Sequence, residues 1–289
     1  MHMPQRPTLE ALVARVSELV SPPEIHLRLH EVIESPSSTS DDIAEVIMTD
    51  PNLSARILKI TNSAYYGRRR IETVSRAITL IGTRDLYNIA LAINAMRVFE
   101  KIPSELVNVP VFWRHSLYTA IISRLLARRA RILHPERLFV AGLLHDIGCL
   151  VLYSAFPEES RNALLVAQGD ETLLAEQERE LIGYNHAEVG GELLRLWKIP
   201  DTLCNAVAWH HRPLDAPETS IEIPIIAIAD ALANRSEEGA FSGTGGHATL
   251  IDPALWARIG ADESLVEDLW EEVDEQFAEA AQALMPGLR

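Results

Sequence analysis

The residues most able to do chemistry in this sequence are an adjacent polar pair, His145 and Asp146, inside an apolar run. The run occupies residues 138–153 and reads LFVAGLLHDIGCLVLY. A segment this apolar is buried on most sides, and it is too short to cross a membrane. An ionised Asp in such surroundings needs a hydrogen-bonding partner or a metal ion. The pair is therefore either a structural His–Asp pair with local partners or part of a metal site.

Further imidazole and carboxylate side chains recur on the apolar segments of the second half of the chain. They are His115, His186, His210, His211 and Asp230. A single histidine of this kind is more often a core or surface residue than a ligand, but together with two acids the set favours one shared site. Imidazole and carboxylate suit iron, manganese, zinc or nickel, and helix bundles build two-metal sites from such residues. We predict one or two divalent transition-metal ions among His115, His145, Asp146, His186, His210 or His211, and Asp230.

Asp146 is the natural bridging carboxylate of such a centre, and it is the catalytic residue if the protein is an enzyme. On a continuous helix over residues 136–153, His145 and Asp146 would diverge by about 100° and could serve two sides of one centre. His115 lies on a helix predicted at residues 111–127. Its steps of four, three and four to Thr119, Ile122 and Leu126 place it on the apolar face.

The remaining ligand candidates also fall on predicted helices. Asn185 and Glu188 form a capping-box pattern, which places His186 at the start of a helix running to residue 198. Gly190 and Gly191 are costly inside that helix, and close backbone packing would explain them. The next helix ends in His210 and His211, and Asp230 lies in an apolar helix at residues 224–233. Two polar, Glu-rich helices at residues 158–182 are expected on the outside.

Helical periodicity also accounts for the first half of the chain. Apolar spacing and caps predict helices at residues 8–20, 24–33, 40–48, 51–66, 72–80 and 83–99, with no alternating strand pattern. Pro103 and Pro110 bracket a connector. We therefore expect an all-α, multi-helix bundle with two helical lobes, at residues 1–108 and 109–235. A flexible loop at residues 239–246 and an acidic helical tail belong to a third segment, residues 236–289.

Four basic side chains could face a phosphate group. Arg128 and Arg129 belong to the densest basic cluster, where cations at a helix C-terminus are the simpler explanation. Lys198 and Arg212 follow the two later histidine-bearing helices. A phosphate-binding role for these four residues is the weaker alternative.

Composition excludes several classes of protein. The 289 residues are 47% hydrophobic and carry a formal net charge of −15, which argues against a nucleic-acid binder or an anionic membrane as partner. The N-terminal stretch MHMPQRPTLE has no apolar core, so no signal peptide is expected. Cys149 and Cys204 lack a disulfide framework and indicate free thiols in a reducing compartment. These features predict a cytoplasmic protein.

Several separated motifs resemble known families. HDIG at residues 145–148, and the order His, His-Asp, His, His-His, Asp, resemble the HD superfamily of metal-dependent phosphohydrolases, especially its HD-GYP branch. DPNLSARILKITNSAYYG, followed by VSRAITLIGTRDL, is similar to the HDOD family, the HD-related output domain of bacterial signalling proteins. NHAEVGGELLRLWKIP and AVAWHHRP resemble the same family. The similarity covers roughly residues 19–234.

The resemblance implies an HD-domain-like helical fold and a role in signal transduction, with signalling proteins or self-association as partners. HDOD proteins are generally regarded as non-catalytic or of unproven catalysis. This sequence retains candidates for every HD metal position. It lacks the Glu-x-x-Asp-Gly-x-Gly-Tyr-Pro segment that follows His-His in HD-GYP phosphodiesterases, and Cys149 stands where active relatives commonly carry Lys.

We therefore predict a metal-binding regulatory module without cyclic dinucleotide phosphodiesterase activity. The alternative is a metal-dependent phosphohydrolase that acts on a phosphodiester or nucleotide. A phosphate-containing ligand is a candidate small-molecule partner in either case. A third reading is an inactive pocket whose polar side chains are held only by hydrogen bonds.

Overall fold

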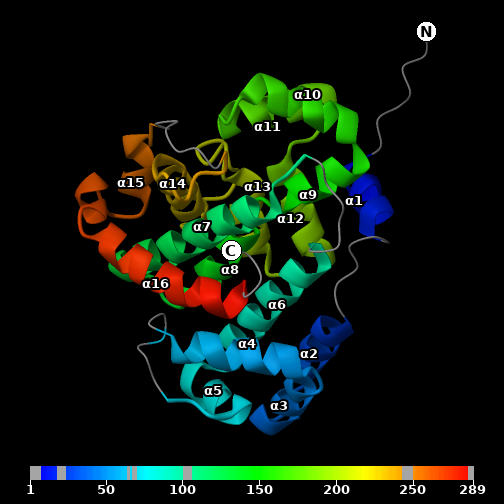
Figure 1. The fold of residues 1–289 in the computed structure, drawn as a ribbon, viewed down its shortest axis with the longest axis vertical. Coiled ribbons are helices and arrows are strands. Elements are labelled where there is room, and N and C mark those ends of the chain that lie inside the picture. The colour runs from blue at the N-terminus through cyan, green and yellow to red at the C-terminus, as the bar shows by residue number, and fades with distance from the viewer. Residues whose placement is uncertain are drawn as a thin grey trace. The chain divides into compact units, whose positions relative to one another are not determined.

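The structure, a computed structural model, describes residues 8–17, 24–63, 66, 70–99, 106–242 and 250–285. These residues form helices joined by turns and loops and include no β-strand, which confirms the all-α prediction (Figure 1). The chain divides into two compact units. The first comprises Met1–Ser21 and Ile102–Leu265, and the second comprises Pro22–Lys101 and Val266–Arg289.

These units group the chain differently from the three predicted segments. The last helix, α16 (Leu269–Leu284), packs against α4 (Pro51–Asn62) and so belongs to the second unit. Arg56 supports this packing, because its Nη1 donates to the carbonyl oxygen of Leu284 at 3.3 Å. The short helix α15 (Pro253–Arg258) belongs to the first unit. The predicted connector at Pro103 lies outside the described residues.

The second unit is built from short amphipathic helices around an apolar core. Asp50 caps α4 by accepting hydrogen bonds from the backbone N–H groups of Asn52 and Leu53, and Pro51 begins the helix as predicted. Thr39 caps α3, because its side chain accepts the backbone N–H of Asp42. The other helices of the unit are α2 (Glu24–Glu34), α3 (Ser40–Met48), α5 (Val74–Ile81) and α6 (Thr83–Phe99).

The first unit surrounds α7 (Val109–Arg129), whose side chains are almost all buried between Phe112 and Ala127. It packs most closely against α8 and α14, while α12 packs against α9 and α13. The helices of this unit besides α7 and α15 are α1 (Leu9–Ser17), α8 (Glu136–Leu144), α9 (Ile147–Ala155), α10 (Pro157–Ala167), α11 (Glu171–Leu181), α12 (His186–Leu196), α13 (Asp201–Trp209) and α14 (Glu222–Arg235).

The apolar run around the His–Asp pair is two helices rather than the single helix that we predicted. α8 ends at Leu144, α9 begins at Ile147, and His145 and Asp146 form the junction. Asp146 has φ −99° and ψ 8°, outside regular helical geometry, and its side chain is buried. Together the segment Glu136–Ala155 has 20 residues and is long and apolar enough to cross a membrane, contrary to our length argument. However, 89% of its apolar stretch is buried inside the protein, as expected of a core segment.

Two glycines allow the helices of the first unit to approach each other closely. A Cβ on Gly148 would lie 2.0 Å from the carbonyl oxygen of His186, and one on Gly191 would lie 2.9 Å from the carbonyl oxygen of Cys204. These contacts join α9 to α12 and α12 to α13. Close backbone packing, as we predicted, therefore explains why position 191 is glycine despite the low helix propensity of that residue.

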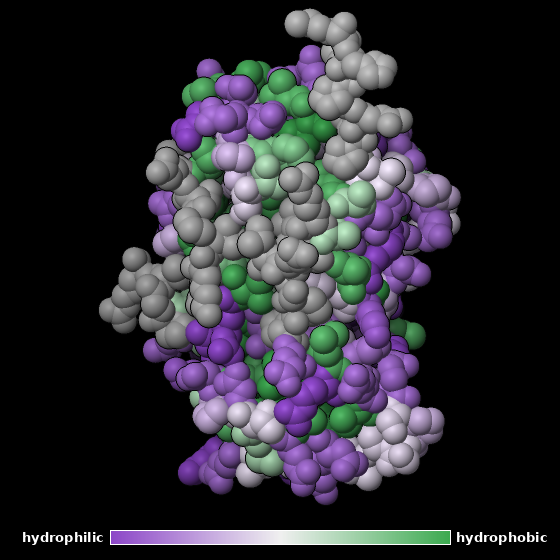
Figure 2. All heavy atoms as spheres, turned by 90° about the vertical axis from the view of Figure 1, so that its right-hand side faces the viewer, coloured by the Kyte–Doolittle hydropathy of each residue, from purple (hydrophilic) through white to green (hydrophobic). Residues whose placement is uncertain are grey.

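The surface carries both hydrophilic and hydrophobic side chains. On the face drawn in Figure 2, hydrophilic residues in purple and hydrophobic residues in green are interspersed. Large exposed hydrophobic side chains are scattered along the chain, as at Leu133, Leu165 and Leu196.

Candidate metal centre

Asp146 lies at the middle of the predicted ligand set, and its two carboxylate oxygens face different imidazoles. Oδ2 lies 3.2 Å from Nε2 of His145 and 3.5 Å from Nε2 of His115. Oδ1 lies 3.4 Å from Nε2 of His186 and 3.5 Å from Nε2 of His210. The side chain is only 1% exposed. One buried carboxylate therefore joins two groups of ligand atoms, as a bridging ligand would.

The first group, which we call the first subsite, consists of His115, His145 and Asp230 with Oδ2 of Asp146. Oδ1 of Asp230 lies 3.3 Å from Nε2 of His115 and 3.6 Å from Nε2 of His145. The two imidazole nitrogens are 3.2 Å apart. The ligand atoms of the two histidines and Asp230 all lie within 4.8 Å of one another, which is close enough to share one ion.

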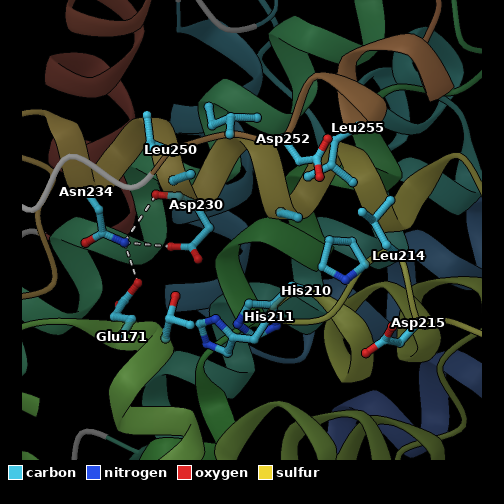
Figure 3. Close-up of a pocket in the computed structure, with 15 residues that line it drawn as sticks. Glu171, His210, His211, Leu214, Asp215, Asp230, Asn234, Leu250, Asp252 and Leu255 are labelled. Carbon is cyan, nitrogen blue, oxygen red and sulfur yellow. Dashed lines mark hydrogen bonds between the residues drawn. The ribbon is translucent and has the colours of Figure 1, made fainter.

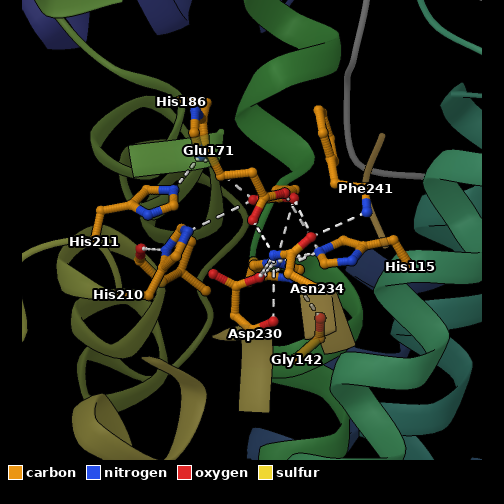
Figure 4. A network of polar contacts seen from close by, with 12 residues as sticks. His115, Gly142, Glu171, His186, His210, His211, Asp230, Asn234 and Phe241 are labelled. Atoms are coloured by element: carbon orange, nitrogen blue, oxygen red, sulfur yellow. Dashed lines mark hydrogen bonds and ion pairs between the residues drawn. The ribbon is translucent and has the colours of Figure 1, made fainter. Parts of the chain in front are cut away.

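The second group, the second subsite, consists of His186, His210 and His211 with Oδ1 of Asp146. Nε2 of His186 and Nε2 of His211 are 2.7 Å apart. The ligand atoms of these four residues also lie within 4.8 Å of one another. Both members of the His210–His211 pair therefore reach the centre, a choice that the sequence left open. Figure 4 shows His186, His210 and His211 in the same polar network as His115, Glu171 and Asp230.

The outer ring nitrogen of four histidines is held by a hydrogen-bond acceptor. Carbonyl and carboxylate oxygens only accept, so each Nδ1 carries a proton and each Nε2 is the nitrogen that faces the centre. This arrangement orients imidazoles for metal binding. The pairs are His115 with the carbonyl of Gly239 at 2.7 Å, His145 with Gly142 at 2.7 Å, His210 with Val207 at 2.6 Å, and His186 with the Glu178 carboxylate at 2.6 Å.

Charge in the centre is balanced only if extra cations or protons are present. Burial lowers the pKa of His145, but the carboxylates of Asp146 and Asp230 outweigh it and raise that pKa to about 10. Burial raises the pKa of Asp146, but His145 outweighs it and holds the pKa well below its ordinary value. For His211, burial and the neighbouring His210 lower the pKa well below its ordinary value. Divalent ions would displace the added protons and satisfy the facing lone pairs.

The polar atoms that face the centre fit a metal. Both oxygens of Asp146, Nε2 of His210 and Oε1 of Glu171 are buried and have no hydrogen-bond partner among the described residues. Buried polar atoms are rarely left this way, and a cluster of them with mixed imidazole and carboxylate chemistry suits a transition metal. When bound, two such ions would polarise a substrate oxygen and lower the pKa of water.

The four basic residues predicted to face phosphate are not gathered at this centre. Arg128 and Arg129 lie in the last turn of α7, about 20 Å along the helix from His115 by the rise per residue. Nη1 of Arg129 donates to the carbonyl of Leu265 at 2.8 Å. Lys198 is exposed in the turn after α12. Arg212 stacks over Trp209, at 5.5 Å from the ring centre.

Sequence reasoning missed the acidic side chains that α11 sends into the centre. The helix was expected on the outside, but Glu171 and Glu178 are buried. Asn234 on α14 was also missed, and it donates through Nδ2 to Oδ1 of Asp230 at 2.9 Å. The spacing of seven between the two glutamates, with Leu174 between them, places them on one helical face but does not mark that face as buried.

A cavity of about 250 Å³ opens beside the centre (Figure 3). Glu171, His210, His211 and Asp230 contribute to one part of its wall, and much of the rest is apolar. Asp215 and Asp252 add further acidic groups. No lysine or arginine is among the described residues that line it. Its full lining is Glu171, Thr172, His210, His211, Pro213, Leu214, Asp215, Ala227, Asp230, Ala231, Asn234, Leu250, Ile251, Asp252 and Leu255.

His211 also lines a neighbouring cavity of about 410 Å³, where Arg179 and Arg212 contribute to the wall together with Glu176 and Glu180. Of the four predicted phosphate-facing residues, Arg212 is thus the one placed beside a metal-ligand candidate.

An all-helical unit with a His–Asp junction, further histidines and a second Asp around one buried centre defines an HD-type protein. Residues 19–213 of this chain match the HDOD domain, and the chain belongs to the HDOD family. This confirms the family that the sequence motifs resemble.

Similar proteins come from several bacteria. A protein of uncharacterised function from Treponema pallidum (strain Nichols) is 28% identical over 219 residues, which are 74% of this chain and 42% of that protein. The chain thus spans less than half the length of that relative. An HDOD domain protein of unknown function from Geobacter sulfurreducens shares the fold, with a TM-score of 0.77, 24% identity, and coverage of 96% of this chain and 99% of that chain.

Two further solved structures carry functional names. A candidate phosphohydrolase from Shewanella amazonensis SB2B has a TM-score of 0.72 and 27% identity, covering 94% of this chain and 97% of its own. A candidate signal transduction protein from Marinobacter aquaeolei VT8 has a TM-score of 0.68 and 23% identity, covering 98% of this chain and 62% of its own.

Proposed function

We propose that this chain is a regulatory HDOD protein that binds divalent transition metal in its first unit and transmits the occupied or empty state to partner proteins. Signalling proteins or a second copy of the chain are the expected partners, in the cytoplasm. The observation that carries the proposal is the contrast between a set of residues that could hold metal and a cavity whose described lining residues include no lysine or arginine to hold a phosphate group.

The cavity beside the centre is poorly suited to a cyclic dinucleotide. Its volume of about 250 Å³ lies below the roughly 300–1,000 Å³ of sites for drug-sized ligands. Two carboxylates outside the candidate metal ligands, Asp215 and Asp252, also line it and would repel the phosphate groups of such a ligand. Cys149 is fully buried at the position where the HD resemblance expects Lys, so it adds no positive charge.

A metal-dependent phosphohydrolase is the second candidate. Asp146 bridges two subsites, the arrangement that two-metal hydrolases use to activate water and to stabilise the charge of a displacement at phosphorus. Arg179 and Arg212 beside His211 could bind the phosphate of a small substrate. The name of the Shewanella relative favours the same alternative.

The two candidates are separated by a hydrolysis assay on metal-loaded protein. Protein loaded with Mn²⁺ or Fe²⁺ is incubated with cyclic dinucleotides, linear dinucleotides, nucleotides and an aryl phosphodiester. The regulatory proposal predicts no turnover above that of the Asp146→Ala variant. Turnover that requires both the metal and Asp146 would overturn it in favour of the phosphohydrolase.

The regulatory proposal also requires that metal change the state of the protein. Limited proteolysis of the full chain, with Mn²⁺ and with chelator, should give different cleavage patterns in the first unit. Identical patterns for a protein that demonstrably binds the metal would count against signalling by occupancy.

A further inference from the structure

Helix α11 supplies a carboxylate that no sequence motif assigned to the metal centre. Glu171, the first residue of α11, places Oε1 3.6 Å from Nε2 of His115. The side chain is 7% exposed, and Oε1 has no hydrogen-bond partner among the described residues. Its ligand atom also lies within 4.8 Å of those of His115 and Asp146. Glu171 therefore faces the first subsite as a further ligand atom would.

The other oxygen of Glu171 is fixed by Asn234. Nδ2 of Asn234 donates to Oε2 of Glu171 and also to Oδ1 of Asp230 at 2.9 Å (Figure 3). The amide oxygen of Asn234 accepts the backbone N–H of Phe241 at 3.0 Å, which sets the orientation of the amide. One oriented amide thus aims Glu171 and Asp230 at the same subsite, as outer-shell residues of metal sites do.

A second glutamate on α11 acts on the other subsite. Glu178 is fully buried, and Oε2 accepts the backbone N–H of His186 at 2.8 Å and its Nδ1–H at 2.6 Å. Seven residues separate Glu178 from Glu171, which is about two turns or 10.5 Å along one helical face. A single helix therefore reaches both subsites, one directly and one through His186.

The contacts of Glu171 and Glu178 with the centre are important for holding α11 in place, because α11 otherwise packs mainly against α10. α11 packs far more extensively against α10 than against α12. The two helices share a small apolar cluster of Ala163, Ala167 and Leu174, with Leu164 and Phe241 packed against it. Two carboxylates buried at the inner face of this hairpin are costly without compensating positive charge. Metal in the two subsites would supply that charge.

We propose that the hairpin formed by α10 and α11 closes on the metal centre, with Glu171 as an additional ligand of the first subsite and Glu178 as a positioning residue for His186. The inference rests on the proposed metal centre. It adds that metal occupancy controls how firmly the hairpin is docked, which gives the regulatory protein an element that reports the state of its centre.

The test compares wild type, Glu171→Gln and Glu176→Gln. Glu176 lies on the same helix, is exposed in the wall of the neighbouring cavity and belongs to neither subsite, so its variant removes the same charge without changing a candidate ligand. Chelated protein is titrated with Mn²⁺ alone, and hydrogen exchange is followed at the amides of α10 and α11. We expect Mn²⁺ to slow exchange in wild type and in Glu176→Gln. In Glu171→Gln, Mn²⁺ should bind at least about 10-fold more weakly and should slow hydrogen exchange only a little.

Equal Mn²⁺ affinity and equal slowing of exchange in Glu171→Gln and wild type would overturn the inference while leaving the metal centre intact. A wild-type protein that binds no metal would instead overturn the proposed function, and this inference with it. If circular dichroism shows that Glu171→Gln does not fold, Asn234→Ala replaces it, since that change releases the aimed carboxylate but keeps its charge. The same affinity and exchange criteria then apply.

The role of Glu178 has a spectroscopic test. Co²⁺ bound at the second subsite reports its imidazole ligands by visible absorption. Glu178→Gln should shift that absorption and weaken Co²⁺ binding by about 10- to 100-fold, while Glu176→Gln leaves both unchanged. An unshifted spectrum in folded Glu178→Gln would show that Glu178 does not position His186.

Discussion

Asp146 is the residue on which both subsites depend. Its oxygens face His145 and His115 on one side and His186 and His210 on the other. A buried carboxylate in this position is stabilising only with compensating positive charge, so its contribution to stability depends on the metal.

Asp146→Ala should therefore cost more stability with metal than without it. In excess Mn²⁺ the variant is expected to melt below wild type, because ligand at about 100 times its Kd stabilises a protein by about 2.7 kcal/mol and the variant loses this term. In chelator the loss of stability should be smaller, because the wild type then has no bound metal and the variant has no such term to lose. Thermal unfolding in both buffers measures this. A variant less stable by the same amount in both buffers would contradict the metal reading.

The helix cap Asp50 should make the stability of the second unit depend on pH. Burial raises its pKa, but the N–H of Leu53 and the side chain of Arg97 outweigh it and hold the pKa below its ordinary value. Because the folded pKa is the lower one, the stabilisation is present above the unfolded pKa of about 3.9 and is lost as pH falls through the folded value. Asp50→Ala should cost about 1 kcal/mol at pH 7 and less at pH 3. Urea unfolding at both pH values tests this, and a constant difference would refute it.

At the residue scale, the sequence could identify the histidines and the two aspartates because each stands out in an apolar segment. It could not identify Glu171 and Glu178. α11 contains four glutamates, and a helix of that composition is typical of a solvated face. Which of them turn inward depends on where α10 and α14 lie, and periodicity in one segment does not encode that.

At the scale of elements, the junction of α8 and α9 sets the geometry of the centre. Sequence periodicity predicts one continuous helix there, because apolar residues occupy every position around the pair. The structure ends α8 at Leu144, so that Asp146 is free of regular helical geometry. α9 also packs closely against α12 at Gly148, and a tertiary contact of this kind cannot be read from the apolar pattern of one segment.

Gly148→Ala should damage both stability and the second subsite. The added Cβ would meet the His186 carbonyl oxygen at 2.0 Å and the backbone nitrogen of Gly190 at 2.7 Å, and backbone atoms cannot rotate away. Overpacking of this kind costs typically about 1–3 kcal/mol, and a shifted α12 moves His186 off the centre. Thermal unfolding and metal content measure the two effects.

Gly260→Ala is the control for this change. Nothing lies within 4 Å of a Cβ there, but φ is +69°, so the variant is strained without a clash. It should lose some stability and keep its metal. Equal metal loss in both variants would show that the close approach at Gly148 does not position His186.

At the scale of the whole molecule, the all-α class and the family follow from the sequence, because helix periods, caps and several long motifs all agree. The grouping of the helices into two units does not follow from the sequence. α16 is amphipathic and acidic, and its sequence does not mark α4 as the helix that covers its apolar face. The two units are therefore a result of the structure, and among the described residues the candidate metal centre lies in the first unit.

The most direct test is the transition-metal content of freshly purified protein, measured by elemental analysis beside the Asp146→Ala variant. One or two ions per chain in wild type, and loss of them in the variant, are the result that convergence of His115, His145, His186, His210, His211 and Asp230 on Asp146 predicts. Protein that carries no iron, manganese, zinc or nickel, and that takes none up when these ions are supplied, would contradict it.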